Sequence, residues 1–185
     1  MEQAFALAQR AVAVDDSLAQ AHVTLGTVYL WKKQYDQAIA EAERAIVLDS
    51  NFAEAYTWLG EALRRAGRPE EALGLIEKAM RLNLHYPPFY LYQLGEAYRS
   101  TGRYEEAIAA YKKVLTRNPD LLLSHLGLAT IYSELGREEE ARAEAAEVLR
   151  LNPKYSLEVL RQMSPYKDPA VLERMIAALR KAGLK

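Results

Sequence analysis

The chain contains no cysteine. Disulfide bonds, thiolate metal sites and a cysteine nucleophile are therefore excluded, and the absence fits a reducing compartment, so we expect a cytoplasmic protein. An excess of positive charge is lacking as well, because 24 Lys and Arg oppose 25 Asp and Glu. Proteins that bind nucleic acid or anionic lipid through a basic surface need such an excess, and we expect neither partner.

Long apolar runs are also missing. No stretch approaches the ~20 apolar residues that a membrane-spanning helix needs. The apolar beginning of the chain is interrupted by Glu2, Gln9 and Arg10, unlike a signal peptide. Half of the 185 residues are apolar, yet alternating β-branched segments are absent and only 9 Gly and 7 Pro occur. This composition predicts an all-α protein with a substantial core.

The sequence repeats itself at a nearly constant spacing. Leu-Gly pairs occur at 25–26, 59–60 and 94–95, and Leu-Ala follows at 128–129, which gives steps of 34, 35 and 34 residues. At fixed distances after them come an alanine and then an acidic or amide residue: Ala38, Ala72, Ala107 and Ala141, and Asp49, Asn83, Asn118 and Asn152. A period of this length indicates a repeat architecture.

Each repeat is expected to form two helices. Gly67, Gly102 and Gly136 end the first helix, since glycine adopts the left-handed conformation there without steric cost. Acidic residues begin the second helix, where they complement the helix dipole. Lys33 replaces this glycine in the first repeat, so we expect a less regular turn there. The recurring glycines and alanines should let the two helices approach each other closely.

The pattern L-G-x-x-Y, followed by alanine and by a turn near proline, resembles the tetratricopeptide repeat. The resemblance covers residues 19–155. It implies an all-α, right-handed superhelical solenoid of helix-turn-helix repeats. We expect repeats at 19–52, 53–87, 88–121 and 122–155. Residues 1–18 match the second helix of a preceding repeat whose first helix is missing, which suggests a fragment of a longer protein.

Residues 156–185 are expected to form capping helices. Asp168-Pro169 is a typical helix start. An apolar stripe follows at helical spacing: Val171, Leu172, Met175, Ile176 and Leu179. A cap would cover the last repeat, and a partner-binding tail is the alternative.

The stretch YKDPAVLERMIAALRKAGL, residues 166–184, also resembles the end of repeat arrays in bacterial signalling proteins. Those arrays follow a class III nucleotide cyclase domain or a TolB-like domain. The resemblance implies that this chain is the regulatory or docking part of such a protein.

No pattern in the sequence points to catalysis. His22 and His125 occupy a repeat position that Tyr56 and Leu91 fill elsewhere, so we interpret it as a packing position, and His85 lies in an inserted turn. The acidic pairs recur at helix starts, and phosphate loops, nucleophile elbows and H-E-x-x-H motifs are absent. We therefore expect a non-enzymatic protein without a cofactor or a metal.

The family resemblance implies that inner positions of the first helix of each repeat line a concave groove. The candidate peptide-binding residues are Val23, Thr27, Leu30, Trp58, Glu61, Arg64, Phe89, Tyr92, Glu96, Arg99, Leu126 and Thr130. Apolar and aromatic side chains accompanied by arginine are typical of interaction sites. The sequence thus predicts a groove for an extended peptide or an amphipathic helix. Packing of Phe89, Leu123 and Leu126 against a neighbouring repeat is the alternative.

The leading functional hypothesis is a non-enzymatic protein–protein interaction module with a protein or peptide ligand. The alternative is self-association as a homodimer, or docking within a longer cyclase-type enzyme. Four apolar residues near the beginning of the chain would supply the self-association surface: Phe5, Leu7, Val12 and Val14.

Overall fold

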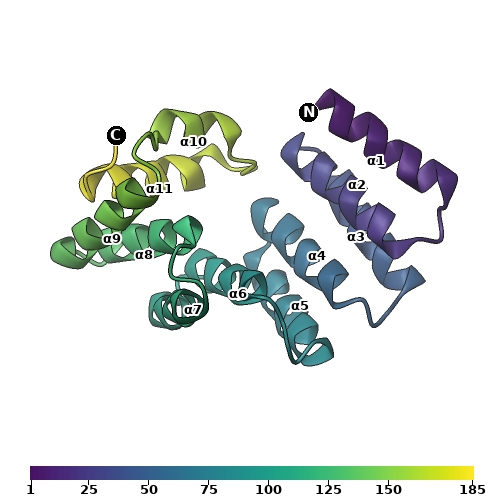
Figure 1. Cartoon of the computed structure of the whole chain (residues 1–185), viewed down its shortest axis with the longest axis horizontal. Coiled ribbons are helices and arrows are strands. Elements are labelled where there is room, and N and C mark those ends of the chain that lie inside the picture. The colour runs from purple at the N-terminus through teal and green to yellow at the C-terminus, as the bar shows by residue number, and fades with distance from the viewer. The chain divides into compact units, whose positions relative to one another are not determined.

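The computed structural model describes all residues 1–185, which form eleven α-helices and no strand (Figure 1). The all-α prediction is therefore confirmed. The helices are α1 (Glu2–Val14), α2 (Ala19–Trp31), α3 (Tyr35–Leu48), α4 (Ala53–Arg65), α5 (Pro69–Leu82), α6 (Pro88–Ser100), α7 (Tyr104–Arg117), α8 (Leu122–Glu134), α9 (Glu138–Leu151), α10 (Leu157–Met163) and α11 (Pro169–Lys181).

The helices belong to two compact units. The first unit contains Met1–Tyr86 together with the short segment Pro165–Lys167. In it, α2 packs on α3 and α4 packs on α5, while α1 and α3 contact the helices that follow them. Small core clusters join the pairs, such as Leu30 with Ala38 and Ala62.

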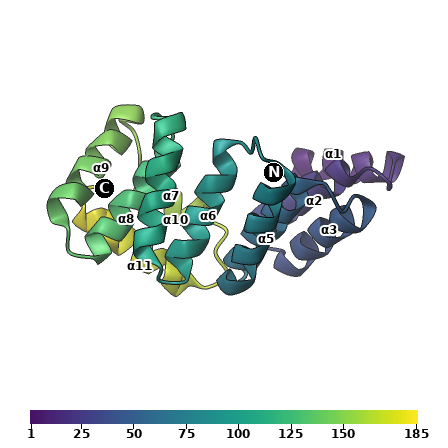
Figure 2. The same cartoon turned by 90° about the horizontal axis from the view of Figure 1, so that it is seen from below.

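The second unit contains Pro87–Ser164 and Asp168–Lys185. Its helix pairs are α6 with α7 and α8 with α9, and α11 packs on α8; Figure 2 shows the helices from a second side. Ile176, Leu179 and Leu184 are fully buried there. The backbone N–H of Leu157 donates to the carbonyl of Lys185 at 2.8 Å, which holds the end of the chain against the start of α10.

Small residues set the distance between the two helices of a pair. Ala72 is fully buried. A Cβ atom on Gly60 would lie only 3.3 Å from the Ala72 carbonyl and 2.9 Å from Ile76, and one on Gly26 would lie 3.1 Å from the Ala38 carbonyl. Glycine and alanine therefore permit a backbone approach that larger residues would prevent.

The turns between paired helices have one geometry. Gly67, Gly102 and Gly136 adopt φ of 91°, 75° and 74°. Lys33 adopts φ of 60° at the same place. Its N–H donates to Leu30 O at 2.9 Å, just as Gly67 N–H donates to Arg64 O at 3.1 Å. The expectation of a less regular first turn was wrong, because the hydrogen bonds that close the turn hold lysine in the left-handed conformation.

Lys33→Gly should raise the free energy of unfolding by about 0.5–1 kcal/mol. The substitution removes the steric cost of a Cβ in the left-handed region, which outweighs the greater freedom of glycine in the unfolded chain. Urea denaturation of the two proteins measures the difference. The mirror substitution Gly67→Ala, at φ 91°, should destabilise, and equal midpoints for all three proteins would contradict this explanation.

His22 and His125 make the same two contacts in different repeats. Nδ1 of His125 lies 2.6 Å from Glu144 Oε2 and its Nε2 lies 2.9 Å from Pro119 O. His22 has the same distances to Glu41 and to Asp16 O. In another repeat, Tyr56 Oη donates to Ser50 O at 2.9 Å. The side chain at this repeat position therefore contacts the carbonyl six residues earlier in three repeats, which supports the interpretation of a structural role.

The stability contributed by His125 should depend on pH. Its hydrogen bond with Glu144 raises the pKa of the ring, and burial opposes this rise only in part. Both partner atoms are acceptors, so the protonated ring satisfies both. Because the folded-state pKa exceeds the unfolded value near 6.5, this stabilisation is complete below about pH 6 and is lost as the pH rises through the folded pKa.

The free energies of unfolding of wild type and His125→Tyr should be compared, because the variant carries the tyrosine that another repeat has at this position. The stability advantage of wild type in urea should be larger at about pH 5.5 than at about pH 8.5. An advantage that does not change with pH would contradict the assignment.

Candidate binding surface

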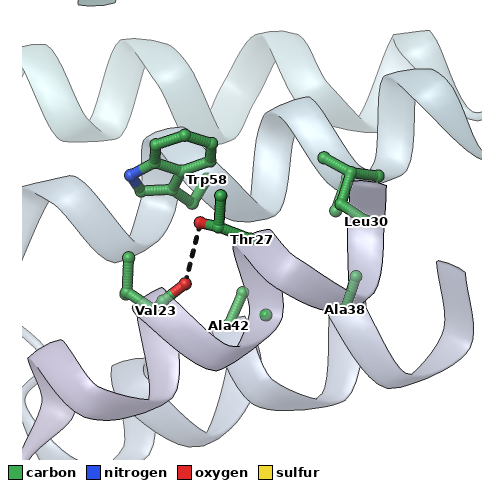
Figure 3. A pocket seen from close by; sticks show the side chains of 8 residues that line it. Val23, Thr27, Leu30, Ala38, Ala42 and Trp58 are labelled. Atoms are coloured by element: carbon green, nitrogen blue, oxygen red, sulfur yellow. Dashed lines mark hydrogen bonds between the residues drawn. The ribbon is translucent and has the colours of Figure 1, made fainter. Parts of the chain in front are cut away.

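The predicted groove residues of the first unit come from α2 and α4. Val23, Thr27 and Leu30 line a small pocket beneath the Trp58 side chain (Figure 3). The Thr27 hydroxyl donates to Val23 O at 2.9 Å. The pocket has a volume of about 10 Å³, which is room for one water molecule and far too little for a cofactor.

Val23 and Leu30 are only 2% and 1% exposed. Val23 packs with Ala45 and Ala55. Both residues therefore contribute to the core between helices. Thr27 and Trp58 keep partial exposure, and the Trp58 indole N–H donates to Glu54 at 3.2 Å.

The end of α4 carries a cluster of charged and aromatic side chains. Arg65 Nε donates to Glu61 Oε1 at 2.8 Å, and its guanidinium lies 5.7 Å from the Trp31 ring. Glu61 and Arg64 are buried, whereas Trp31 stays 40% exposed. We call Trp31, Trp58, Glu61, Arg64 and Arg65 the α4 surface.

A non-helical piece of the same chain lies on the α4 surface. We call this segment, Pro165–Lys167, the strap; it connects α10 to α11 and belongs to the first unit. Arg64 Nη1 donates to Tyr166 Oη at 3.2 Å. The Tyr166 ring also lies 5.3 Å from the Arg65 guanidinium. The Lys167 N–H donates to Arg65 O at 3.0 Å.

The strap was not among the predicted site residues. Its sequence signal is Pro165 and Pro169 on either side of Tyr166, which indicates a short non-helical segment between the capping helices. Nothing in the repeat period points to its contact with α4.

In the second unit, α6 carries four of the predicted residues. The Phe89 and Tyr92 rings are 6.3 Å apart, and Arg99 Nη2 donates to Glu96 Oε2 at 3.0 Å. Tyr92, Glu96 and Arg99 are buried, and Phe89 is half-buried. This cluster is closed by Tyr111 of α7, whose hydroxyl donates to Glu96 Oε1 at 2.6 Å. Burial raises the pKa of Tyr111 well above its ordinary value.

The two remaining predicted residues lie on α8. Leu126 and Thr130 are both buried, and the Thr130 hydroxyl donates to Leu126 O at 2.8 Å. In the first unit, Val23, Thr27, Leu30 and Trp58 thus line one pocket. In the second unit, the predicted residues of α6 contact one another in two pairs, Phe89 with Tyr92 and Glu96 with Arg99.

The structure offers neither a metal site nor a membrane-spanning helix. No three His, Cys, Asp or Glu side chains are placed to hold a metal ion together. None of the helices combines the length and apolar character that crossing a membrane requires.

Two family models match the chain. Residues 31–114 match the model described as anaphase-promoting complex, cyclosome, subunit 3, and residues 98–163 match a tetratricopeptide repeat model. No curated protein matches the chain.

Solved structures of similar fold include three proteins. MamA is 26% identical, with a TM-score of 0.63 over 81% of this chain and 87% of its own. TTC0263, a thermophilic TPR protein of Thermus thermophilus, is 24% identical, with a TM-score of 0.73 over 95% of this chain and 89% of its own. YrrB, described as a TPR protein with an unusual peptide-binding site, is 19% identical, with a TM-score of 0.61 over 95% and 90%. Residues 98–163 thus resemble the tetratricopeptide repeat in sequence, and the chain shares its helix-pair fold with solved tetratricopeptide-repeat proteins.

Proposed function

We propose that the chain is a non-enzymatic protein-binding module that holds a polypeptide segment on the α4 surface. The observation that carries this proposal is the grouping of arginine and tryptophan beside a buried acid, with Trp31 left 40% exposed. Interfaces concentrate their binding energy in tryptophan, tyrosine and arginine. Arg65 is oriented by Glu61, so it is held in place before a ligand arrives.

Selection of peptides from a displayed random library against the intact chain tests this function. Selected peptides should bind with a Kd that rises at least tenfold in Trp31→Ala. The matched control is Val47→Ala, because Val47 is also apolar and is 74% exposed on α3. Peptides whose affinity is unaffected by Trp31→Ala would place binding elsewhere and refute the α4 surface.

We also propose that the chain serves as a docking or regulatory part of a larger bacterial signalling protein in the cytoplasm. The likeness of residues 166–184 to array endings of cyclase-type and TolB-like proteins supports this. An antibody against that segment should detect, in extracts of the source cells, a protein well above the 20.9 kDa of this chain. A single band at 20.9 kDa would contradict it.

Self-association is the second candidate, and one observation favours it. Leu7 and Val14 of α1 are 68% and 79% exposed. Phe5, by contrast, packs on Tyr29 with ring centres 5.4 Å apart. Light scattering should then show a dimer that Leu7→Glu dissociates, and a monomer at high concentration would rule this candidate out.

A further inference from the structure

We propose that the strap is an internal ligand: the first unit binds an extended peptide through a tyrosine, and Tyr166 occupies that site until a competing segment displaces it. This inference rests on the proposed function and names both its ligand class and its regulation.

The backbone contact is the kind that a bound peptide makes. At the end of α4, Leu63 O and Arg64 O accept from Arg68 and Gly67 within the turn. The carbonyl of Arg65 accepts from Lys167 N–H at 3.0 Å. The last carbonyls of a helix have no partner within the helix, so they offer acceptors to any extended chain that lies across the helix end.

The side-chain contacts select an aromatic residue with a hydroxyl group. The Tyr166 ring lies 5.3 Å from the Arg65 guanidinium and 5.8 Å from that of Arg64, within the range of cation–π attraction. The Tyr166 hydroxyl accepts from Arg64 at 3.2 Å. An aliphatic side chain could make neither contact, and phenylalanine could make only the first.

The strap is flanked by extended residues and is not helical itself. The residues on its two sides, Ser164 and Asp168, are extended, with φ/ψ of −71°/126° and −90°/113°. Asp168 Oδ1 accepts from Ala170 N–H at 2.8 Å and so begins α11 immediately after the strap. The strap is therefore a short non-helical segment between two helix ends.

The shortness of the strap makes it replaceable. Its contacts with the rest of the first unit include the backbone hydrogen bond, the tyrosine hydrogen bond and the cation–π contacts, and Lys167 Nζ lies 6.0 Å from the Tyr35 ring. A longer peptide could keep the tyrosine contacts and add others on Trp31 and Trp58. Such a peptide would bind more weakly to the closed chain than to one whose site is vacant, because it must first displace Tyr166.

The test uses a fluorescent peptide of sequence QMSPYKDP, which reproduces residues 162–169. Its Kd for the intact chain is measured by fluorescence anisotropy. Tyr166→Ala, which vacates the site, should lower the Kd at least tenfold relative to wild type. Met163→Ala is the matched control, because Met163 is 63% exposed beside the strap, and its Kd should equal that of wild type.

Two further binding measurements test whether the peptide occupies the Tyr166 site. In the Tyr166→Ala background, Arg64→Ala should abolish binding, and a peptide with phenylalanine in place of tyrosine should bind more weakly than the tyrosine peptide. Absence of peptide binding to Tyr166→Ala would overturn the internal-ligand proposal. Library peptides that still depend on Trp31 would then leave the proposed function standing.

Two other outcomes would distinguish internal closure by the strap from an open site and from a strap that a second copy of the chain supplies. Equal affinity of wild type and Tyr166→Ala would show an open site without internal competition, which overturns the proposal while the binding function survives. A wild-type dimer that Tyr166→Ala converts to monomer would mean that a second copy supplies the strap, and this too would overturn internal closure.

Discussion

Tyr111→Ala should lower the free energy of unfolding by about 3–5 kcal/mol, the range for removing a large aromatic side chain from a core. Tyr111 of α7 is fully buried in the second unit. For a Cβ atom built on Gly95 of α6 or on Gly127 of α8, the three nearest atoms all belong to the Tyr111 side chain. Its removal would therefore leave a cavity among three helices at once.

The two glycines show how tightly the ring is enclosed. A Cβ on Gly95 would lie 2.7 Å from Tyr111 Cε1, and one on Gly127 would lie 2.6 Å from Tyr111 Cζ. Real Cβ atoms do not approach other atoms this closely, so each glycine is required by the ring. Gly127→Ala should therefore destabilise wild type by about 1–3 kcal/mol.

A double-mutant cycle in urea makes this prediction specific. Once Tyr111 is alanine, the space beside Gly127 is open, so Gly127→Ala should then cost little. Tyr111→Phe should lose only the hydroxyl contact with Glu96, about 1–3 kcal/mol. Additive effects of Gly127→Ala and Tyr111→Ala would show that the ring and the glycine do not meet.

Ala72→Leu should destabilise by about 1–3 kcal/mol, because the first unit has no space for the added side chain. Ala72 of α5 is fully buried and its carbonyl faces Gly60 of α4 at close range. The larger residue would push the two helices apart and disturb Ile76, which packs at the same contact.

The control for this prediction lies on another face of the same helix. Gly74 of α5 is exposed and has no atom within 4 Å of its would-be Cβ. Gly74→Leu adds the same side chain to the same helix without a clash, and the higher helix propensity of leucine should stabilise slightly. Thermal unfolding at the wild-type temperature for Ala72→Leu would show that the helix contact is looser than described.

The contacts of the two buried histidines with glutamate were not predicted, although the sequence contains enough information to predict them. The partner of each histidine lies nineteen residues later: Glu41 for His22 and Glu144 for His125. The repeat that has Tyr56 carries Leu75 at the partner position. Comparing these two repeat positions together would have predicted the histidine–glutamate hydrogen bonds, because a polar residue in a buried position needs a polar partner.

The local structure of this protein can be predicted from its repeat pattern alone. The helix turns at Gly67, Gly102 and Gly136, the helix start at Asp168 and the close contact at Ala72 all follow from residue types read within one repeat. These features depend on backbone conformation and on neighbours at fixed separation, so a repeated pattern is enough to specify them.

The burial of the predicted groove residues depends on tertiary contacts that the repeat pattern does not reveal. Val23 and Leu30, predicted in the groove, are buried because the next helix pair covers them. Tyr166 lies on Arg64 across 102 residues of sequence, and Tyr111 lies against Gly127 of a different repeat. Such contacts depend on where the chain returns in space, and a local period carries no information about that return.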